Sequence, residues 1–166
     1  PGGVRFPARR EFRLGARLLA RLRGPEGPFG EFPQSYSARE GREVIVIDAV
    51  THRRDAVFHT IVPAEMEHLL LGAIPREATL LAHLKRSFPN VTDVHLSIGG
   101  VARYHLVVQM KKTREGQAKN VSLGAFGGHY DLKQVTVVAQ DVDIHAPSNV
   151  QRAGAKPHDP ERERAE

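Results

Sequence analysis

The sequence contains no cysteine and no tryptophan, and it has no long uninterrupted run of apolar residues. Without cysteine, the chain has no disulfide framework, no thiolate nucleophile and no cysteine-ligated zinc or iron–sulfur site. A membrane-spanning helix needs about 20 consecutive apolar residues. The N-terminal stretch 12–22 is interrupted too often by arginine to form the apolar core of a secretion signal. We therefore predict a cytoplasmic protein without a membrane span.

Acidic residues are scarce at the N-terminal end, where the net charge of +5 is concentrated. Glu11 is the only acid among the first 23 residues, which contain seven arginines: Arg5, Arg9, Arg10, Arg13, Arg17, Arg21 and Arg23. Aromatic residues are few and do not alternate with the basic residues, as they do on surfaces that stack nucleic-acid bases. The sequence therefore argues against a nucleic-acid partner.

Dense β-branched runs and apolar residues at helical spacing predict an α/β (α+β) protein. Strands are expected over residues 44–50, 57–62, 91–98, 104–110 and 135–139, with 142–144 continuing the last, and helices over 63–71, 75–88 and 113–126. The first two strands are expected to pair with each other, and Gly72 is expected to end the first helix before Pro75 begins the second. From residue 90 on, this order of elements predicts a small open α/β sandwich with a mixed sheet.

The two ends of the chain differ in composition from its centre. Residues 1–23 combine arginine with leucine and alanine, and two interpretations stand: a basic amphipathic helix over 13–22, or a disordered arm. Residues 151–166 are charged, contain proline and are nearly free of apolar side chains, which predicts a disordered tail. We therefore expect the folded part of the chain between residues 24 and 150.

Two carboxylates lie five residues apart in the segment Glu26-Gly27-Pro28-Phe29-Gly30-Glu31-Phe32. On a regular strand they would point to opposite faces, but the glycines and the proline disfavour a regular strand and allow both to enter one pocket. Two neighbouring carboxyls push their pKa values apart, so one keeps a proton at neutral pH and can act as a general acid. The alternative is a solvated surface turn.

This segment, with Tyr36 and Ser37 after it, resembles the signature of the UbiD family, decarboxylases that use prenylated flavin mononucleotide (prenylated FMN). The resemblance runs from about Glu26 to about Val150. It implies the end of a split β-barrel flavin-binding domain over residues 24–74, a connecting helix over 75–89 and a C-terminal α/β oligomerisation domain over 90–150. Residues 1–23 and 151–166 then form the basic arm and the tail.

The resemblance implies a carboxy-lyase that acts on an aromatic or α,β-unsaturated carboxylic acid. Glu31 would protonate the carbon from which carbon dioxide has left, and Glu26 would support the network that orients an arginine and the substrate carboxylate. Phe32, Glu67 and Leu71 fall where the family lines its substrate pocket.

The resemblance also implies which parts lie outside this chain. In the family, the residues that hold the flavin phosphate and its divalent metal, Mn or Mg, come from upstream of the two-glutamate segment. No cofactor-binding residue is therefore assigned, and we expect this chain alone to be incomplete and inactive. The implied partners are a carboxylic acid substrate, further copies bound through the C-terminal domain, and a missing N-terminal flavin-domain partner. The alternative is a non-catalytic assembly module, which would have no chemical reason to keep both glutamates.

Three metal-ligand residue types alternate near the C-terminal end, at Asp141, Asp143 and His145. On a strand they would share a face and could bind a metal. Acidic residues after a buried strand also cap loops, and this is the interpretation that we adopt. No metal ligand is predicted in this chain.

Overall fold

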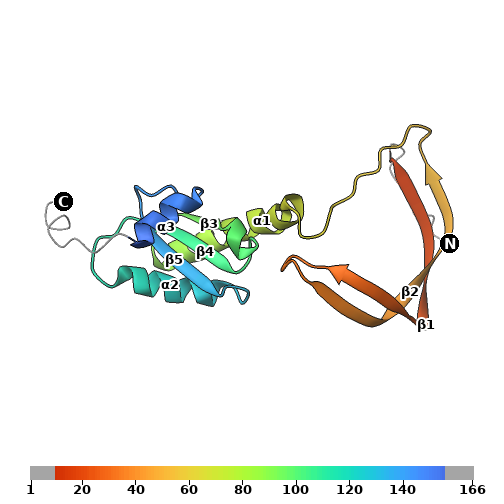
Figure 1. Cartoon of the computed structure of the whole chain (residues 1–166), viewed down its shortest axis with the longest axis horizontal. Coiled ribbons are helices and arrows are strands. Elements are labelled where there is room, and N and C mark those ends of the chain that lie inside the picture. The colour runs from red at the N-terminus through yellow and green to blue at the C-terminus, as the bar shows by residue number, and fades with distance from the viewer. Residues whose placement is uncertain (1–9, 156–166) are drawn as a thin grey trace. The chain divides into compact units, whose positions relative to one another are not determined.

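A computed structural model of the chain describes residues 10–155, except for the side chains of residues 38–40. The predictions for residues 1–9 and 156–166 fall outside this range. The chain divides into two compact units, Pro1–Ala64 and Glu65–Glu166, whose elements can be followed by colour in Figure 1. Within the described range, no helix is both long enough and apolar enough to span a membrane.

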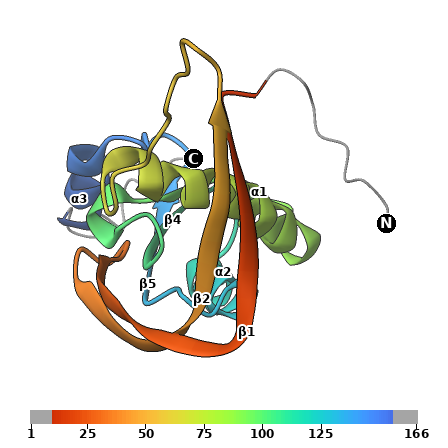
Figure 2. The same ribbon diagram turned by 90° about the vertical axis from the view of Figure 1, so that its right-hand side faces the viewer.

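The first unit is built around a long antiparallel hairpin. Strand β1 spans Phe12–Gly30 and strand β2 spans Tyr36–His52. Leu18 lies opposite Ile45 in the register of the pair, and a shift between Gly15 and Ala16 interrupts its regularity. Such irregularities bend a strand, and Figure 2 shows the pair as one curved ribbon.

Strand β1 replaces both interpretations of residues 13–22. Leu14, Ala16 and Leu18 alternate with other residues at every second position, which is the period of a strand and not of a helix. The β-branched residues of β2 supply the hydrogen-bonding partner. The predicted boundary between an arm and a folded domain at residue 23 therefore lies inside a continuous strand.

The strand predicted over residues 57–62 does not form, because β2 pairs with β1 instead. The backbone after β2 is tied to Glu11, which precedes β1. Arg53 N donates to the Glu11 backbone oxygen at 3.0 Å, and Val57 N donates to Glu11 Oε2 at 3.0 Å. The Arg53 guanidinium also lies 2.9 Å from Glu11 Oε1. These contacts hold the segment at the end of the hairpin without a third strand.

The second unit combines helices with a three-stranded sheet. Its elements are α1 (Met66–Ser87), β3 (Val91–Leu96), the short 3-10 helix η1 (Ile98–Gly100), β4 (His105–Met110), α2 (Gln117–Gly128), β5 (Gln134–Ala139) and α3 (Pro147–Ala155). The strand order is β3-β4-β5, with β3 antiparallel and β5 parallel to β4. The α+β class with a mixed sheet is thus confirmed. The strand continuation predicted over residues 142–144 does not form. Helix α3 was not predicted, and its second half lies in the segment predicted to be a disordered tail.

Helix α1 is continuous, so the break predicted between Gly72 and Pro75 is wrong. A proline inside a helix removes one backbone hydrogen bond and costs about 3 kcal/mol. Buried side chains on both sides of the proline, at Leu69 and Ala73 and again at Leu80, fix one face of the helix against the unit. Tertiary packing of this kind decides helix continuity more strongly than local propensity does.

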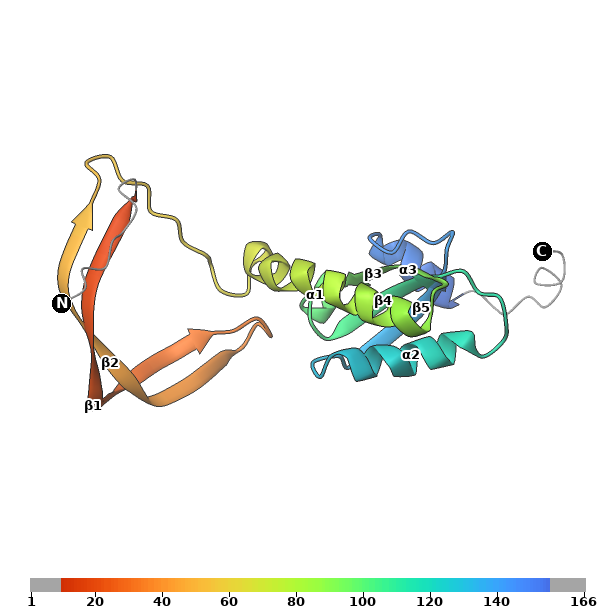
Figure 3. The same cartoon turned by 180° about the vertical axis from the view of Figure 1, so that it is seen from behind.

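The core of the second unit covers both faces of the sheet. Leu80 and Leu84 of α1 and Val121 of α2 are fully buried, as are Leu106 and Val108 of β4. Figure 3 shows α1 and α2 in front of the strands in this view. On the other face a cluster joins the sheet to the α3 region; its members are Val107, Val138, Ile144 and Val150.

The hairpin differs sharply from this core in its burial. Every buried apolar residue of the described range belongs to the second unit. The large apolar side chains of the hairpin are more than half exposed at Leu14, Leu18, Leu22, Ile45, Ile47 and Val50. An isolated two-stranded hairpin is marginally stable in water. The hairpin therefore gains less stability from apolar burial than the second unit does.

Candidate active site

The two predicted catalytic glutamates lie on and next to the end of β1. Glu26 lies within the strand opposite Arg39, and the strand continues to Gly30 opposite Tyr36. Residues 26–30 of the segment are therefore in a strand, although the glycines and the proline disfavoured one, whereas Glu31 and Phe32 lie beyond its end. Register shifts on either side of Glu26 break the regular alternation of faces. The entry of both carboxylates into one pocket stays a prediction.

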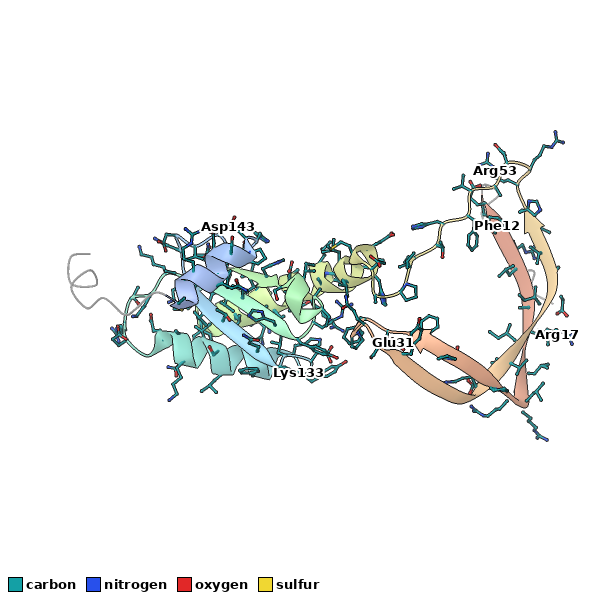
Figure 4. All side chains as sticks on the ribbon, viewed as in Figure 1. Phe12, Arg17, Glu31, Arg53, Lys133 and Asp143 are labelled. Carbon is teal, nitrogen blue, oxygen red and sulfur yellow. The ribbon has the colours of Figure 1, made fainter. Side chains whose placement is uncertain are left out.

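Glu31 opens the turn that connects the two strands. Its backbone N–H donates to the Ser35 oxygen at 3.0 Å, and its backbone oxygen accepts from Gln34 N at 3.0 Å. Gln34 adopts a left-handed conformation with φ 62°, which tight turns require at one position. The Ser37 hydroxyl donates to Glu31 Oε1 at 3.2 Å. Both the backbone and the carboxylate of Glu31 (labelled in Figure 4) are thus oriented by the turn.

Glu26 and Glu31 have different surroundings. The Glu26 side chain is 44% exposed, and its Oε2 lies 3.7 Å from Arg42 Nε on β2. Glu31 is half-buried, as is Phe32, which follows it in the turn. Surface ion pairs such as Glu26–Arg42 hold a side chain only weakly. Of the two, Glu31 has the more shielded and more closely oriented carboxylate.

The remaining predicted substrate residues lie on α1 in the second unit. Glu67 is in the first turn of the helix, and Leu71 follows four residues later, so that both share one side of the helix. Both are exposed, and Leu71 is 55% exposed. Leu69 and Ala73, on the other side, are buried in the unit. Glu67 and Leu71 thus belong to the outward face of α1.

The acidic segment after β5 caps its own loop. Asp143 Oδ1 accepts from His145 N at 2.9 Å. In the part of the chain that the structure describes, no three acidic or histidine side chains come together as a metal site would require. The structure thus gives Asp143 the loop-capping contact that the sequence favoured.

A polar cluster that the sequence did not reveal lies at the β3–β4 end. Ser97 Oγ is 2.9 Å from His105 Nδ1, and His105 Nε2 is 2.9 Å from Thr136 Oγ1. Burial lowers the pKa of His105, and the nearby His95 lowers it further. A serine nucleophile needs a histidine oriented by a third group, usually a carboxylate, and here that place is taken by a threonine. Ser97 also accepts from Gly100 N at 3.2 Å, so the cluster organises the turn around η1.

The sequence also gave no sign of Arg103, a buried arginine beside α1. It lies between η1 and β4, in a segment that is otherwise mostly apolar. A single charge in such a segment, three residues after the pair Gly99-Gly100, is the signal that could have drawn attention to it.

Comparisons with known proteins match the chain over both units. The family model of the 3-octaprenyl-4-hydroxybenzoate carboxy-lyase Rift-related domain matches residues 2–66, and that of the C-terminal domain of the same family matches residues 69–164. These two UbiD models together cover nearly the whole chain.

Individual relatives are longer than this chain. It is 36% identical over 143 residues to the anhydromevalonate phosphate decarboxylase of Methanothermobacter thermautotrophicus, covering 86% of this chain and 34% of that protein. It is 33% identical over 125 residues to the gallate decarboxylase of Lactiplantibacillus plantarum, covering 72% of this chain and 26% of that protein. The chain therefore spans about a third or less of the length of these relatives.

A similar solved structure is an evolved dimeric form of the UbiD-class enzyme HmfF from Pelotomaculum thermopropionicum, in complex with prFMN. The TM-score is 0.81 and the sequence identity 43%, covering 92% of this chain and 36% of that one.

Proposed function

Since the chain belongs to the UbiD family of carboxy-lyases, we propose that it forms part of a decarboxylase for an aromatic or α,β-unsaturated carboxylic acid. The reaction is non-oxidative and uses prenylated FMN. The observation that carries the proposal is the end of the hairpin, where Glu31 is half-buried and held by its turn. Relatives named for the decarboxylation of anhydromevalonate phosphate and of gallate support the reaction class, and the prFMN-bound relative supports the cofactor.

The described residues fit one end of such a cofactor site. A reacting carbon needs a nearby proton donor, and the turn at Glu31 offers an oriented carboxyl group. The metal end of the site needs several clustered acidic or histidine ligands, and the described residues form no such cluster. We therefore assign the chain to the proton-transfer side of the site, with the Mn or Mg ligands supplied from elsewhere in the enzyme.

We assign to Glu31 the proton transfer that completes the reaction. Prenylated FMN, when bound, supplies the electron sink for the loss of carbon dioxide. Breaking the carbon–carbon bond leaves an electron pair on the substrate carbon, and protonated Glu31 donates the proton that forms the new C–H bond. Water then returns a proton to the Glu31 carboxylate. A positioned acid of this kind contributes about 10²–10⁴-fold to the rate.

The other predicted residues bind and orient. Glu26 supports the orientation of an arginine and of the substrate carboxylate. Phe32 follows Glu31 in the turn and offers an apolar surface to the substrate, as Leu71 does from α1. Glu67 supplies a polar contact in the substrate pocket.

The proposal has consequences for the chain by itself. We expect it to bind flavin weakly and not to turn over when purified alone, because its described residues form no acidic or histidine cluster that could hold the divalent metal. We also propose that it forms a homo-oligomer through its C-terminal unit. A pure assembly module, the alternative function, gives no chemical reason for the two glutamates.

The test is a chimera in which this chain replaces the corresponding third of HmfF, produced together with a prenylated-FMN synthase. The measurements are the flavin absorbance of the purified protein and carbon dioxide release from the host's substrate. We expect bound flavin and turnover. Glu31→Gln, which keeps the shape but cannot donate this proton, is expected to retain flavin and to lose about 10²–10⁴-fold in kcat.

The matched control is Glu43→Gln, which removes a carboxylate from β2 of the same hairpin, where Glu43 pairs with Arg23. It is expected to leave kcat unchanged. Full activity of Glu31→Gln would show that the proton comes from another group. A flavin-loaded chimera that releases no carbon dioxide, beside an active host enzyme, would contradict the proposed function.

A further inference from the structure

Arg103 is 7% exposed and is the only buried polar or charged residue among those that the structure describes. Arginine is almost never fully buried unless it is paired, because removing its charge from water is costly. Burial lowers the pKa of Arg103, and Arg76 lowers it further, whereas Asp131 opposes both effects. The Arg76 guanidinium forms its own ion pair with Asp131 at 2.8 Å. A cation in such a desolvated position persists only where its contacts offset the cost of burial.

The Arg103 guanidinium joins two segments that are far apart in the sequence. Nη1 donates to the backbone oxygen of Leu69 in α1 at 3.0 Å and to the backbone oxygen of Ala102 at 2.8 Å. Gly72 of α1 leaves the space that the guanidinium occupies, since a Cβ at residue 72 would overlap it. The absence of a side chain at Gly72 therefore makes room for the Arg103 guanidinium. Through its hydrogen bond to Leu69, Arg103 connects the first two turns of α1 to the loop after η1.

The loop on the other side of this contact has an uncommon backbone. Val101 and Ala102 both have positive φ, at 49° and 53°. A β-branched residue is an outlier in this region, and strain of this kind persists only where the surroundings hold it. Val101 N donates to the Ile98 oxygen at 2.9 Å, and Ala102 N donates to the Ser97 oxygen at 3.0 Å. These bonds fix the direction in which Arg103 leaves the loop.

The part of α1 that Arg103 holds is the part that carries the predicted substrate residues. Leu69 and Gly72 alternate along the helix with Glu67 and Leu71, which face outward. We propose that Arg103 is a positioning residue: it fixes the first turns of α1 and thereby the orientation in which Glu67 and Leu71 meet the substrate. The inference rests on the proposed function for its substrate, and on the contacts above for its structural part.

The first measurement is backbone hydrogen exchange over residues 66–72 in the whole chain. Arg103→Met removes both hydrogen bonds at similar volume, and Gly72→Ala displaces the guanidinium from the opposite side. We expect exchange in this segment to rise about tenfold or more in both variants, since charge-assisted hydrogen bonds are lost. Arg103→Lys keeps one cationic donor and is expected to restore part of the protection.

Gly127→Ala is the matched control, because Gly127 is also a helical glycine and a Cβ there would meet nothing within 4 Å. It is expected to leave exchange over residues 66–72 unchanged. Equal exchange in Arg103→Met, Gly72→Ala and the control would overturn the inference.

The second measurement separates positioning from general stability. In the active chimera described above, Arg103→Lys and Gly72→Ala are expected to raise KM about tenfold with a smaller change in kcat. Faster exchange with unchanged KM would refute the role in substrate positioning. An inactive chimera before any substitution would instead remove the proposed function, and the positioning role with it, whatever the exchange result.

Discussion

The contrast in burial between the two units makes a quantitative prediction about two leucines. Leu84 of α1 is 0% exposed, whereas Leu18 of β1 is 61% exposed. Replacing a fully buried leucine with alanine costs about 2–5 kcal/mol, because transfer free energy is lost and a cavity remains. For a domain of about 100 residues, the size of the second unit (Glu65–Glu166), about 1 kcal/mol corresponds to a change of about 4–8 °C in Tm. Leu84→Ala is therefore expected to lower Tm by roughly 10 °C or more.

Leu18→Ala removes the same atoms from a side chain that is mostly in water. We expect a change within about 0.5 kcal/mol from burial, and less than about 1 kcal/mol more from the lower β-propensity of alanine. Urea unfolding followed by circular dichroism measures the free energy of unfolding of both leucine variants, and thermal unfolding measures their Tm. Circular dichroism is used because the chain has no tryptophan to report by fluorescence. The m-value is expected to stay constant across the variants if each changes stability alone.

Two results would refute this reasoning. Equal destabilisation by Leu18→Ala and Leu84→Ala would mean that the apolar face of the hairpin is covered in the folded protein in solution. A loss below about 0.5 kcal/mol for Leu84→Ala would mean that the core between α1 and the sheet is not packed as described. Leu123→Ala on α2, at a leucine that is 62% exposed, is the control for helical position.

Two further predictions concern the polar contacts of the second unit. The pKa of His105 is lowered by burial and by His95. Below about pH 6.5 the unfolded chain therefore binds the proton more readily than the folded chain, and stability falls with falling pH. His105→Asn is expected to make Tm depend less on pH between about pH 7.5 and 5.5, and an unchanged dependence of Tm on pH would contradict this. Glu77 Oε1 accepts from Leu96 N at 2.7 Å, so Glu77→Ala is expected to cost about 1–3 kcal/mol in urea unfolding by leaving that buried N–H unpaired. Glu77→Gln keeps an acceptor and is expected to cost less; equal losses would point to the charge.

Local patterns in the sequence predicted much of the second unit. The strands around Val94, Val108 and Val137 and the helix around Val121 all form, because each has its own β-branched or amphipathic pattern. The mixed sheet follows from the order of these elements. The segment Glu26–Phe32, with Tyr36 and Ser37 after it, indicated the UbiD family, to which the two family models assign the chain.

The errors occurred where a distant segment decides local structure. Residues 13–22 form a strand because β2 pairs with them. Helix α1 passes through Pro75 because its buried face lies against the rest of the unit. Helix α3 forms beside the cluster that includes Val107 and Val138, to which Val150 contributes. The partners in each of these contacts are far apart in the sequence, so a short window of sequence does not contain both.

The sequence by itself determined the family and the fold class, because these depend on residue identities at short spacings. The catalytic roles of Glu26 and Glu31 stay predictions from the same pattern. The tertiary structure alone decided which carboxylate is oriented by its turn and how α1 is held at Leu69. Ser37 meets Glu31 across the turn, and Arg103 reaches Leu69 from 34 residues away. Such contacts depend on how the chain returns to itself, since hydrogen bonds and burial act through distance in space and not along the sequence.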